Sequence, residues 1–330
     1  MRSLFLRSAV LAGLISVLLL CSCSTGKENE ASGTGVYFDT VIDIKIYDER
    51  AEELLSDCFK LCGDMERILS AHDENSELYR LNHRKGQSVE VSGDLASCIK
   101  AGLYCGEISD GAFDITILPV SGLWDFGSET HRVPGDDEIK EALKKVGYGR
   151  VHCEGNIVTF DDPETQIDLG GIAKGYISSK LKEYLKSEGC TSAMINLGGN
   201  VSTVGSRPDG SAWVVGIQEP FKERGTVYET VEVKDRCVVS SGTYERHFAV
   251  DGKEYHHILD PSTGYPADTS LEQATVVGED DVLCDALSTI CVLLGKEKAG
   301  EMIKEQGIDV DVLFIDTGHN GYWEKAESDR

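Results

Sequence analysis

The chain has 330 residues, of which 41% are hydrophobic and 27% charged, a composition typical of a globular protein with a sizeable core. Its 57 acidic and 32 basic residues give a formal net charge of -25, which argues against nucleic-acid binding because phosphate backbones are bound by basic patches. An anionic small molecule would have to be bound by backbone N–H groups, a few well-placed cations or a divalent metal ion.

The amino terminus has the pattern of an export signal. An apolar run over residues 9–20 follows two arginines and has the length of a signal peptide rather than of a membrane span. It ends in Cys21-Ser22-Cys23, which resembles the bacterial lipobox, where a small residue precedes the lipidated cysteine. We therefore expect residues 1–22 to be a lipoprotein signal peptide and a lipid on Cys23 to anchor the protein to the membrane. An ordinary secreted protein or an uncleaved anchor is the alternative.

Residues 23–33 are small and polar without apolar periodicity, which predicts a flexible tether after the lipidated cysteine. The remaining residues, 34–330, contain no strong linker and no internal repeat, so we expect a single catalytic domain. This part has no second apolar stretch of membrane-spanning length. The domain is therefore expected to face the periplasm or the cell exterior.

The periodicity of apolar residues predicts both strands and helices. Residues 36–47 alternate between apolar and polar and predict one strand, and residues 51–69 predict an amphipathic helix. Strands come in runs as well as alternating with helices, which favours an α+β fold over a doubly wound parallel sheet. Further helices are expected at 95–109, 137–146, 173–188 and 283–294, and strands at 157–160, 193–197, 213–217, 227–233, 238–240 and 273–277.

The 11 cysteines form no CxxC pair and no cluster with zinc-ligand spacing. Most of them have apolar neighbours, which predicts reduced side chains inside the core. A disulfide stays the alternative, because an exported protein meets an oxidising environment.

Two segments combine a strand end with a glycine turn. In residues 168–176 (DLGGIAKGY) an acidic residue and two glycines precede a helix, which suits close approach of a ligand and phosphate binding at the helix start. A purely structural turn is equally compatible with this segment, and it matches neither a dinucleotide-binding nor a Walker loop. Residues 196–200 (NLGGN) predict a tight turn.

Two further segments carry polar side chains suited to chemistry. Residues 256–266 (HHILDPSTGYP) place paired histidines before a turn, although such histidines can be structural. On the helix at 283–294, Asp285, Ser288 and Thr289 are spaced to share a face opposite the apolar one. Their oxygens are the ligands that magnesium prefers, whereas spacing alone favours a solvated helix face.

Taken in order, these motifs and three others, at 111–114 (GAFD), 123–127 (LWDFG) and 240–246 (SSGTYER), resemble the ApbE family of FAD:protein FMN transferases. The resemblance extends from about Phe38 to at least Leu294. It implies an α+β fold related to the tunnelling fold (T-fold), and Mg²⁺-dependent transfer of FMN from FAD to a Ser or Thr hydroxyl of a membrane flavoprotein, with release of AMP. The alternatives are an FAD pyrophosphatase and a non-catalytic FAD-binding lipoprotein.

The resemblance also implies roles for individual residues. Magnesium would be held by Asp285, Thr289 and the backbone carbonyl of Gly171, with Ser288 as a further contributor, and His257 or a nearby carboxylate would be the base. The chain departs from the common family pattern at Phe38, where many members have Met, and at His72, where many have Tyr. No acceptor motif is found in the chain itself, so autoflavinylation is not expected. The implied flavin contacts are Phe38, His72, Ala112, Phe113, Asp114, Asp168, Lys174, His257 and Leu259.

Overall fold

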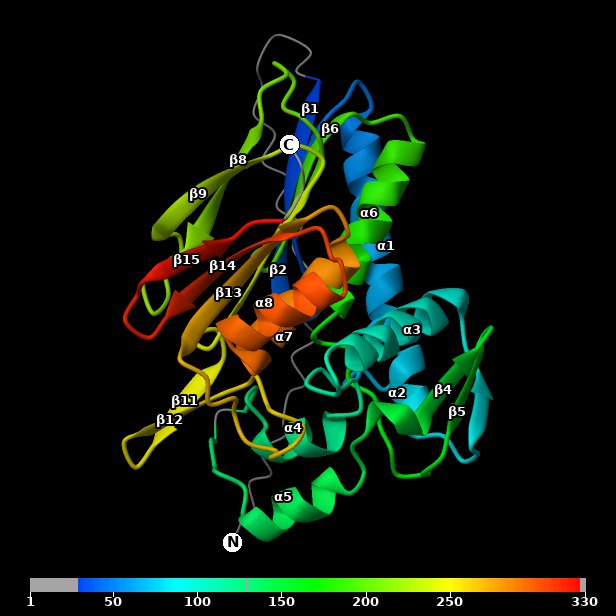
Figure 1. Ribbon diagram of the computed structural model, residues 1–330. Helices are drawn as coiled ribbons and strands as arrows, with labels where there is room; N and C mark the ends of the chain where they lie inside the picture. Colours follow the sequence, from blue (N-terminus) through cyan, green and yellow to red (C-terminus); the bar gives the residue numbers. More distant parts are fainter. Residues whose placement is uncertain (1–28, 129, 327–330) are drawn as a thin grey trace, which may run out of the picture.

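The computed structural model describes residues 29–128 and 130–326, and its centre is an 8-stranded sheet in which every neighbouring pair is antiparallel (Figure 1). The strand order is β1-β2-β6-β7-β10-β13-β14-β15. These strands are β1 (Glu30–Tyr37), β2 (Thr40–Tyr47), β6 (Ser192–Leu197), β7 (Asn200–Gly205), β10 (Cys237–Gly242), β13 (Leu271–Gly278), β14 (Asp311–Asp316) and β15 (Gly321–Glu324).

Helices and smaller sheets surround this central sheet. The helices are α1 (Ala51–Leu69), α2 (Glu77–Asn82), α3 (Gly93–Ile108), α4 (Leu118–Trp124), α5 (Asp136–Leu143), α6 (Ala173–Ser187), α7 (Asp281–Leu294) and α8 (Lys296–Glu305), with a short 3-10 turn at Tyr148–Arg150. The smaller sheets contain β3 (Ser88–Glu90), β4 (Val151–Glu154), β5 (Ile157–Phe160), β8 (Trp213–Gln218), β9 (Val227–Val233), β11 (His247–Val250) and β12 (Lys253–His256). The α+β prediction is confirmed.

Both faces of the central sheet are covered by other elements. Successive side chains along its central strands belong to two different apolar clusters, one on each face. Val239 on β10 and Val276 on β13 belong to the main core, which α1, α6 and α7 complete. The next residues along, Val238 and Val277, point the other way and pack against Trp213 of the β8–β9 hairpin. Because side chains of a strand alternate between faces, a sheet covered on both sides has apolar residues at successive positions.

The amino-terminal boundary and the first strand were predicted wrongly. Residues 36–47 form two strands rather than one, with Phe38 and Asp39 in a two-residue turn at φ 52° and 54°. The N–H of Phe38 donates to Glu66 Oε1 at 2.6 Å, which fixes the turn to α1. Strand β1 begins at Glu30 and pairs with β2 over its whole length, so residues 30–33 belong to the sheet and not to the tether.

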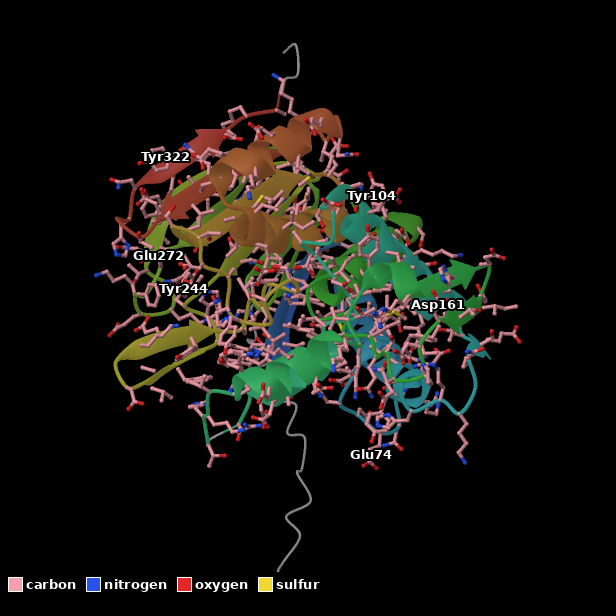
Figure 2. The ribbon with its side chains drawn as sticks, turned by 60° about the horizontal axis from the view of Figure 1, so that its bottom comes forward. Glu74, Tyr104, Asp161, Tyr244, Glu272 and Tyr322 are labelled. Carbon is pink, nitrogen blue, oxygen red and sulfur yellow. The ribbon has the colours of Figure 1, made fainter. Side chains whose placement is uncertain are left out.

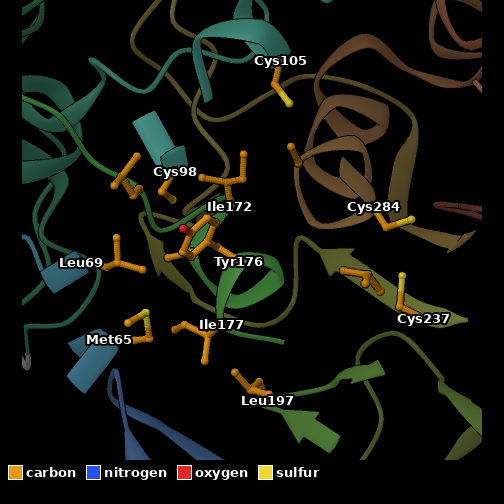
Figure 3. Close-up of a cluster of buried hydrophobic side chains, with 14 of the residues drawn as sticks. Met65, Leu69, Cys98, Cys105, Ile172, Tyr176, Ile177, Leu197, Cys237 and Cys284 are labelled. Carbon is orange, nitrogen blue, oxygen red and sulfur yellow. The ribbon is translucent and has the colours of Figure 1, made fainter. Parts of the chain in front are cut away.

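The main core lies between the sheet and the helices. Figure 3 shows side chains of α1, α3 and α6, among them Met65, Cys98 and Tyr176, packed together. Within the described residues none of the nine cysteines forms a disulfide, and all but Cys153 are buried. The prediction that most cysteines lie inside the core is confirmed for this part of the chain, and their reduced state stays a prediction.

A separate apolar cluster joins α4 and α5 to the β11–β12 hairpin, at the lower end of the molecule in Figure 1. Trp124 lies at its centre, and its Nε1 donates to the carbonyl oxygen of Gly264 at 2.8 Å. This bond fixes the turn that ends the HHILDPSTGYP segment. The cluster therefore holds the paired histidines in place relative to the rest of the domain.

No helix among the described residues is long and apolar enough to cross a bilayer. The predicted signal peptide, residues 1–22, and the predicted lipidation site, Cys23, lie outside the described residues. Export and lipidation therefore stay predictions.

Candidate active site

Four segments that are distant in sequence meet at one end of the central sheet. They are the DLGG turn before α6, the NLGGN turn between β6 and β7, the end of β10, and the middle of α7. Asp285 on α7 is hydrogen-bonded to Gly175 and to Asn200, and Ser241 of β10 is hydrogen-bonded to α7. The helix that carries the DALST motif is thus the centre of the site.

The carboxylate of Asp285 is buried, with 2% of the residue exposed. Its Oδ2 accepts the backbone N–H of Gly175 at 2.8 Å, and its Oδ1 accepts Nδ2 of Asn200 at 2.7 Å. The ammonium of Lys174 lies 3.5 Å from Oδ1. Hydrogen bonds and a nearby cation stabilise the charged form of a buried carboxylate, so this site can hold a negative charge inside the protein.

A row of hydroxyl groups lies beside this carboxylate. Ser288 Oγ donates to the carbonyl oxygen of Asp285 at 2.8 Å, and Ser241 Oγ lies 2.7 Å from Ser288 Oγ. The same Ser241 oxygen lies 3.1 Å from Oγ1 of Thr289. Three hydroxyls and one carboxylate therefore occupy one patch of α7 and β10.

The DLGG turn, which precedes α6, lies next to the hydroxyl groups of α7. A methyl group at Gly171 would lie 2.9 Å from the ring of Phe113 and 4.0 Å from Thr289 Oγ1, so the glycine lets the turn backbone lie against α7. Carboxylate, hydroxyl and backbone carbonyl oxygens are hard ligands of the kind that Mg²⁺ takes. The described residues include no group of three or more His, Cys, Asp or Glu side chains that could hold a metal, so any ion here would depend on Asp285 and neutral oxygens.

The expectation that Asp285 and Ser288 lie on a face of α7 opposite its buried side was wrong. Both residues are buried, whereas Leu283 and Leu294, assigned to the apolar face, are only half-buried. The reason is that α6 and β10 pack against the side of α7 that carries the polar residues, and Asn200 of β7 bonds to Asp285 there. Only Thr289 of the three proposed ligands on this helix keeps some exposure.

The GAFD segment supports the DLGG turn. The N–H of Asp168 donates to the carbonyl oxygen of Ile115 at 2.7 Å, which joins the two segments. Asp114 is buried, and its carboxylate accepts bonds from Thr116 Oγ1 at 2.6 Å and from the N–H of Tyr148 at 2.8 Å. Burial raises the pKa of Asp114. Its side chain therefore shapes this loop, and a flavin contact stays a prediction.

His257 is half-buried, its N–H donates to the carbonyl oxygen of Arg246, and its Nδ1 has no hydrogen-bond partner in the described structure. Burial lowers the pKa of His257 to about 3, and the nearby charges of Arg246, His256 and Lys174 lower it further. The ring is therefore neutral at neutral pH. Two cations, Arg246 and Lys174, lie close enough to this ring to act on it, which makes the region locally positive in an acidic protein.

Four of the predicted flavin contacts lie in parts of the structure other than the DALST helix and the two glycine turns. Phe38 lies in the β1–β2 turn, His72 is exposed after α1, and Ala112 is half-buried after α3. Leu259 is buried in the cluster around Trp124. Their roles stay predictions.

Sequence reasoning missed the residues that surround the DALST motif. Asn200, Ser241 and Gly175 all contact α7, yet none was assigned a role. Each stands in a motif that had been noted, NLGGN, SSGTYER and DLGGIAKGY. What could have revealed them is the recurrence of small and polar residues at strand ends, because such positions allow close backbone approach.

The fold and the site together define an α+β enzyme with an oxygen-rich centre between two glycine turns. A sequence profile of the ApbE family matches residues 38–314, most of the chain. The chain belongs to the ApbE family. The predictions of this family and of a transferase enzyme are confirmed.

Relatives and solved structures support the same assignment. The FAD:protein FMN transferase of Klebsiella pneumoniae (strain 342) is 33% identical over 86% of this chain and 88% of its own length. That of Treponema pallidum (strain Nichols) is 32% identical over 94% of this chain and 93% of its own length. The crystal structure of the ApbE protein from Thermotoga maritima has a TM-score of 0.81 at 31% identity and covers 90% of this chain and 97% of its own. The flavin transferase ApbE from Vibrio cholerae has a TM-score of 0.80 at 27% identity, covering 91% and 97%.

Proposed function

We propose that this protein transfers FMN from FAD to a Ser or Thr hydroxyl of a target flavoprotein, in a Mg²⁺-dependent reaction that releases AMP. The observation that carries the proposal is the meeting of the DALST helix, the DLGG turn and the cationic region around His257 in an ApbE-family chain. The relatives that support it are named FAD:protein FMN transferases.

Asp285, Ser288, Thr289 and the carbonyl of Gly171 would hold the magnesium ion. Their oxygens suit it chemically, and Asp285 carries the one formal negative charge among them. When bound, the ion supplies charge neutralisation to the pyrophosphate of FAD. Because Mg²⁺ gives up its water reluctantly, its affinity should depend mainly on that carboxylate.

The side chains of the protein have separate tasks in the proposed reaction. Lys174 and Arg246 bring positive charge to the anionic substrate in a chain of net charge -25. The acceptor hydroxyl oxygen forms a bond to the FMN-side phosphorus. The bond from that phosphorus to the bridging oxygen of the pyrophosphate breaks, and AMP leaves with the bridging oxygen. We infer that His257 accepts the hydroxyl proton, with a nearby carboxylate as the alternative base.

The proposal extends to where the reaction occurs. A lipid on Cys23 would anchor the enzyme to the membrane, with its domain facing the periplasm or the cell exterior. The acceptor would then be a membrane flavoprotein with a Ser or Thr flavinylation motif on the same side. Mass analysis of the mature protein from cells, which should begin at a lipidated Cys23, tests this part of the proposal.

The decisive comparison is AMP release from FAD and Mg²⁺ with and without an acceptor-motif peptide. A transferase should release AMP in proportion to the peptide that is modified. AMP release at the same rate without peptide would instead support an FAD pyrophosphatase. Absence of AMP after long incubation would support a non-catalytic FAD-binding lipoprotein.

A further inference from the structure

We propose that Asn200, in the NLGGN turn, is the positioning residue that orients the Asp285 carboxylate for metal binding. The side chain of Asn200 is buried, with 3% of the residue exposed, and its Nδ2 donates to Asp285 Oδ1 at 2.7 Å. This inference rests on the proposed function, because it concerns the residue proposed to supply the charge that binds Mg²⁺. It gives a task to a motif that the proposed reaction does not otherwise use.

The turn places Asn200 at the first position of β7. Leu197 and Asn200 pair across the end of the β6–β7 hairpin, and Gly198 and Gly199 form the turn at φ 61° and 106°. A methyl group at Gly198 would overlap the hydroxyl of Thr40 on the neighbouring strand β2. Only glycine satisfies both the positive φ and the close approach at Gly198, and Gly199 adds a second positive φ. These two residues set the turn and, with it, the start of β7 at Asn200.

Besides the ammonium of Lys174, which lies 3.5 Å from Oδ1, two hydrogen-bond donors hold the carboxylate, one at each oxygen. Asn200 binds Oδ1, and the N–H of Gly175 at the start of α6 binds Oδ2 at 2.8 Å. A carboxylate offers about four lone-pair sites, so two hydrogen bonds fix its orientation and leave lone pairs for a metal ion. Partners of this kind set the direction of a metal ligand, and their loss typically costs about 10- to 100-fold in metal affinity.

The other asparagine of the motif has a different task and supplies the matched control. Oδ1 of Asn196 accepts the N–H of Gly199 at 2.8 Å, a bond within the turn itself. Changing Asn196 to Ala therefore loosens the same turn and leaves the donor to Asp285 in place. If Asn200 served only to stabilise the hairpin, the two asparagines would be equivalent in their effect on metal binding.

The test uses Mn²⁺ alone as the probe, titrated into FAD-free protein and followed by calorimetry and by the electron paramagnetic resonance of free Mn²⁺. Asn200→Leu keeps a similar volume and removes the donor, and we expect its Mn²⁺ dissociation constant to rise about 10- to 100-fold. Asn196→Ala should keep the wild-type constant. In turnover, Asn200→Leu should need more Mg²⁺ for half-maximal rate and regain much of its kcat at saturating Mg²⁺.

The outcomes separate this inference from the proposed function. Loss of Mn²⁺ binding in Asp285→Asn together with wild-type affinity in Asn200→Leu overturns the positioning role and leaves the metal site standing. Unchanged Mn²⁺ binding in Asp285→Asn overturns both. If Asn200→Leu does not fold, Asn200→Ser replaces it in the test. The serine hydroxyl is too short to reach Asp285 in place of Nδ2, so we expect the same rise in the Mn²⁺ dissociation constant.

Discussion

The imidazole of His257 lies half-buried beside Arg246 and Lys174. This environment makes the stability of the protein depend on pH below neutral. Its pKa in the folded protein is about 3, against an ordinary value of 6.5. Between these values the unfolded chain binds a proton at this ring that the folded protein excludes. The stability that His257 contributes is therefore fully present above pH 6.5 and is lost as the pH falls toward 3.

We expect His257→Gln to lose less stability than the wild type when the pH is lowered from about 6.5 to 4, because the substituted side chain takes up no proton. The measurement is the urea midpoint of unfolding at a series of pH values. His72→Gln, which changes an exposed histidine, is the control and should follow the wild-type curve. Parallel curves for His257→Gln and the wild type would show that the ring is freely protonated in the folded protein.

The burial of Asp285 changes the stability expected for a variant that lacks its carboxylate. On a solvated helix face its removal would leave stability unchanged, but the structure places two donors on its carboxylate. Asp285→Ala leaves the N–H of Gly175 and Nδ2 of Asn200 without an acceptor, which should cost about 1–3 kcal/mol of unfolding free energy. Urea unfolding without metal measures this cost. An unchanged midpoint would contradict the buried hydrogen bonds.

The spacing of Asp285, Ser288 and Thr289 was enough to predict that these residues share one side of a helix. Their partners could not be predicted, because Asn200 is 85 residues away from Asp285 in sequence and reaches it only through the sheet. Short-range periodicity carries no information about such pairs. The ligand types were therefore foreseen, whereas the residues that orient them were not.

At the scale of elements, α6 and α7 pack unusually closely at Gly175. A methyl group there would overlap the carbonyl oxygen of Asp281 and lie 2.6 Å from Cβ of Asp285. The two helices would have to separate, and the N–H that binds Asp285 would move with α6. Close packing at a glycine thus links the position of one helix to the orientation of the proposed ligand.

Gly175→Ala should destabilise the protein by about 1–3 kcal/mol, because the overlap outweighs the higher helix propensity of alanine. Gly122→Ala is the matched control, since Gly122 lies in helix α4 with nothing within 4 Å of an added methyl group. We expect that control to be neutral or slightly stabilising. Urea unfolding of both variants measures the difference, and equal midpoints would show that α6 and α7 are not held at this distance.

Elements with strong periodicity could be predicted, and elements fixed by tertiary contacts could not. Helix α1 has the bounds that its apolar pattern indicated, Ala51–Leu69. The β1–β2 turn was missed because Phe38 and Asp39 carry no glycine or proline signal, and the contact to Glu66 that fixes the turn comes from a helix. The burial of α7 was missed because a polar face looks the same in sequence whether water or other polar groups cover it.

At the scale of the whole molecule, the sheet begins earlier than the sequence suggested. Strand β1 starts at Glu30, and its residues Gly33 and Gly35 lie against the ring of Phe59 on α1. We propose, from the export signal in the sequence, that the lipid on Cys23 supplies location rather than stability. A soluble form that begins near Ser24 should fold and keep its activity.

A second form that begins at Val36 provides the contrast, because it lacks most of β1 and uncovers the edge of β2. We expect a lower urea midpoint for this form and a wild-type midpoint for the form that begins near Ser24. Loss of folding in the longer form would show that residues before Ser24 are part of the domain.

The central claim is that this protein attaches FMN to a protein hydroxyl through the centre formed by Asp285 and its neighbours. The most direct test is mass spectrometry of an acceptor-motif peptide after incubation with FAD, Mg²⁺ and the protein. We predict an added FMN on a Ser or Thr of the peptide, an equal amount of AMP, and loss of both with Asp285→Asn or a metal chelator. An unmodified peptide alongside FAD cleavage, or full modification by a folded Asp285→Asn variant, would contradict the account.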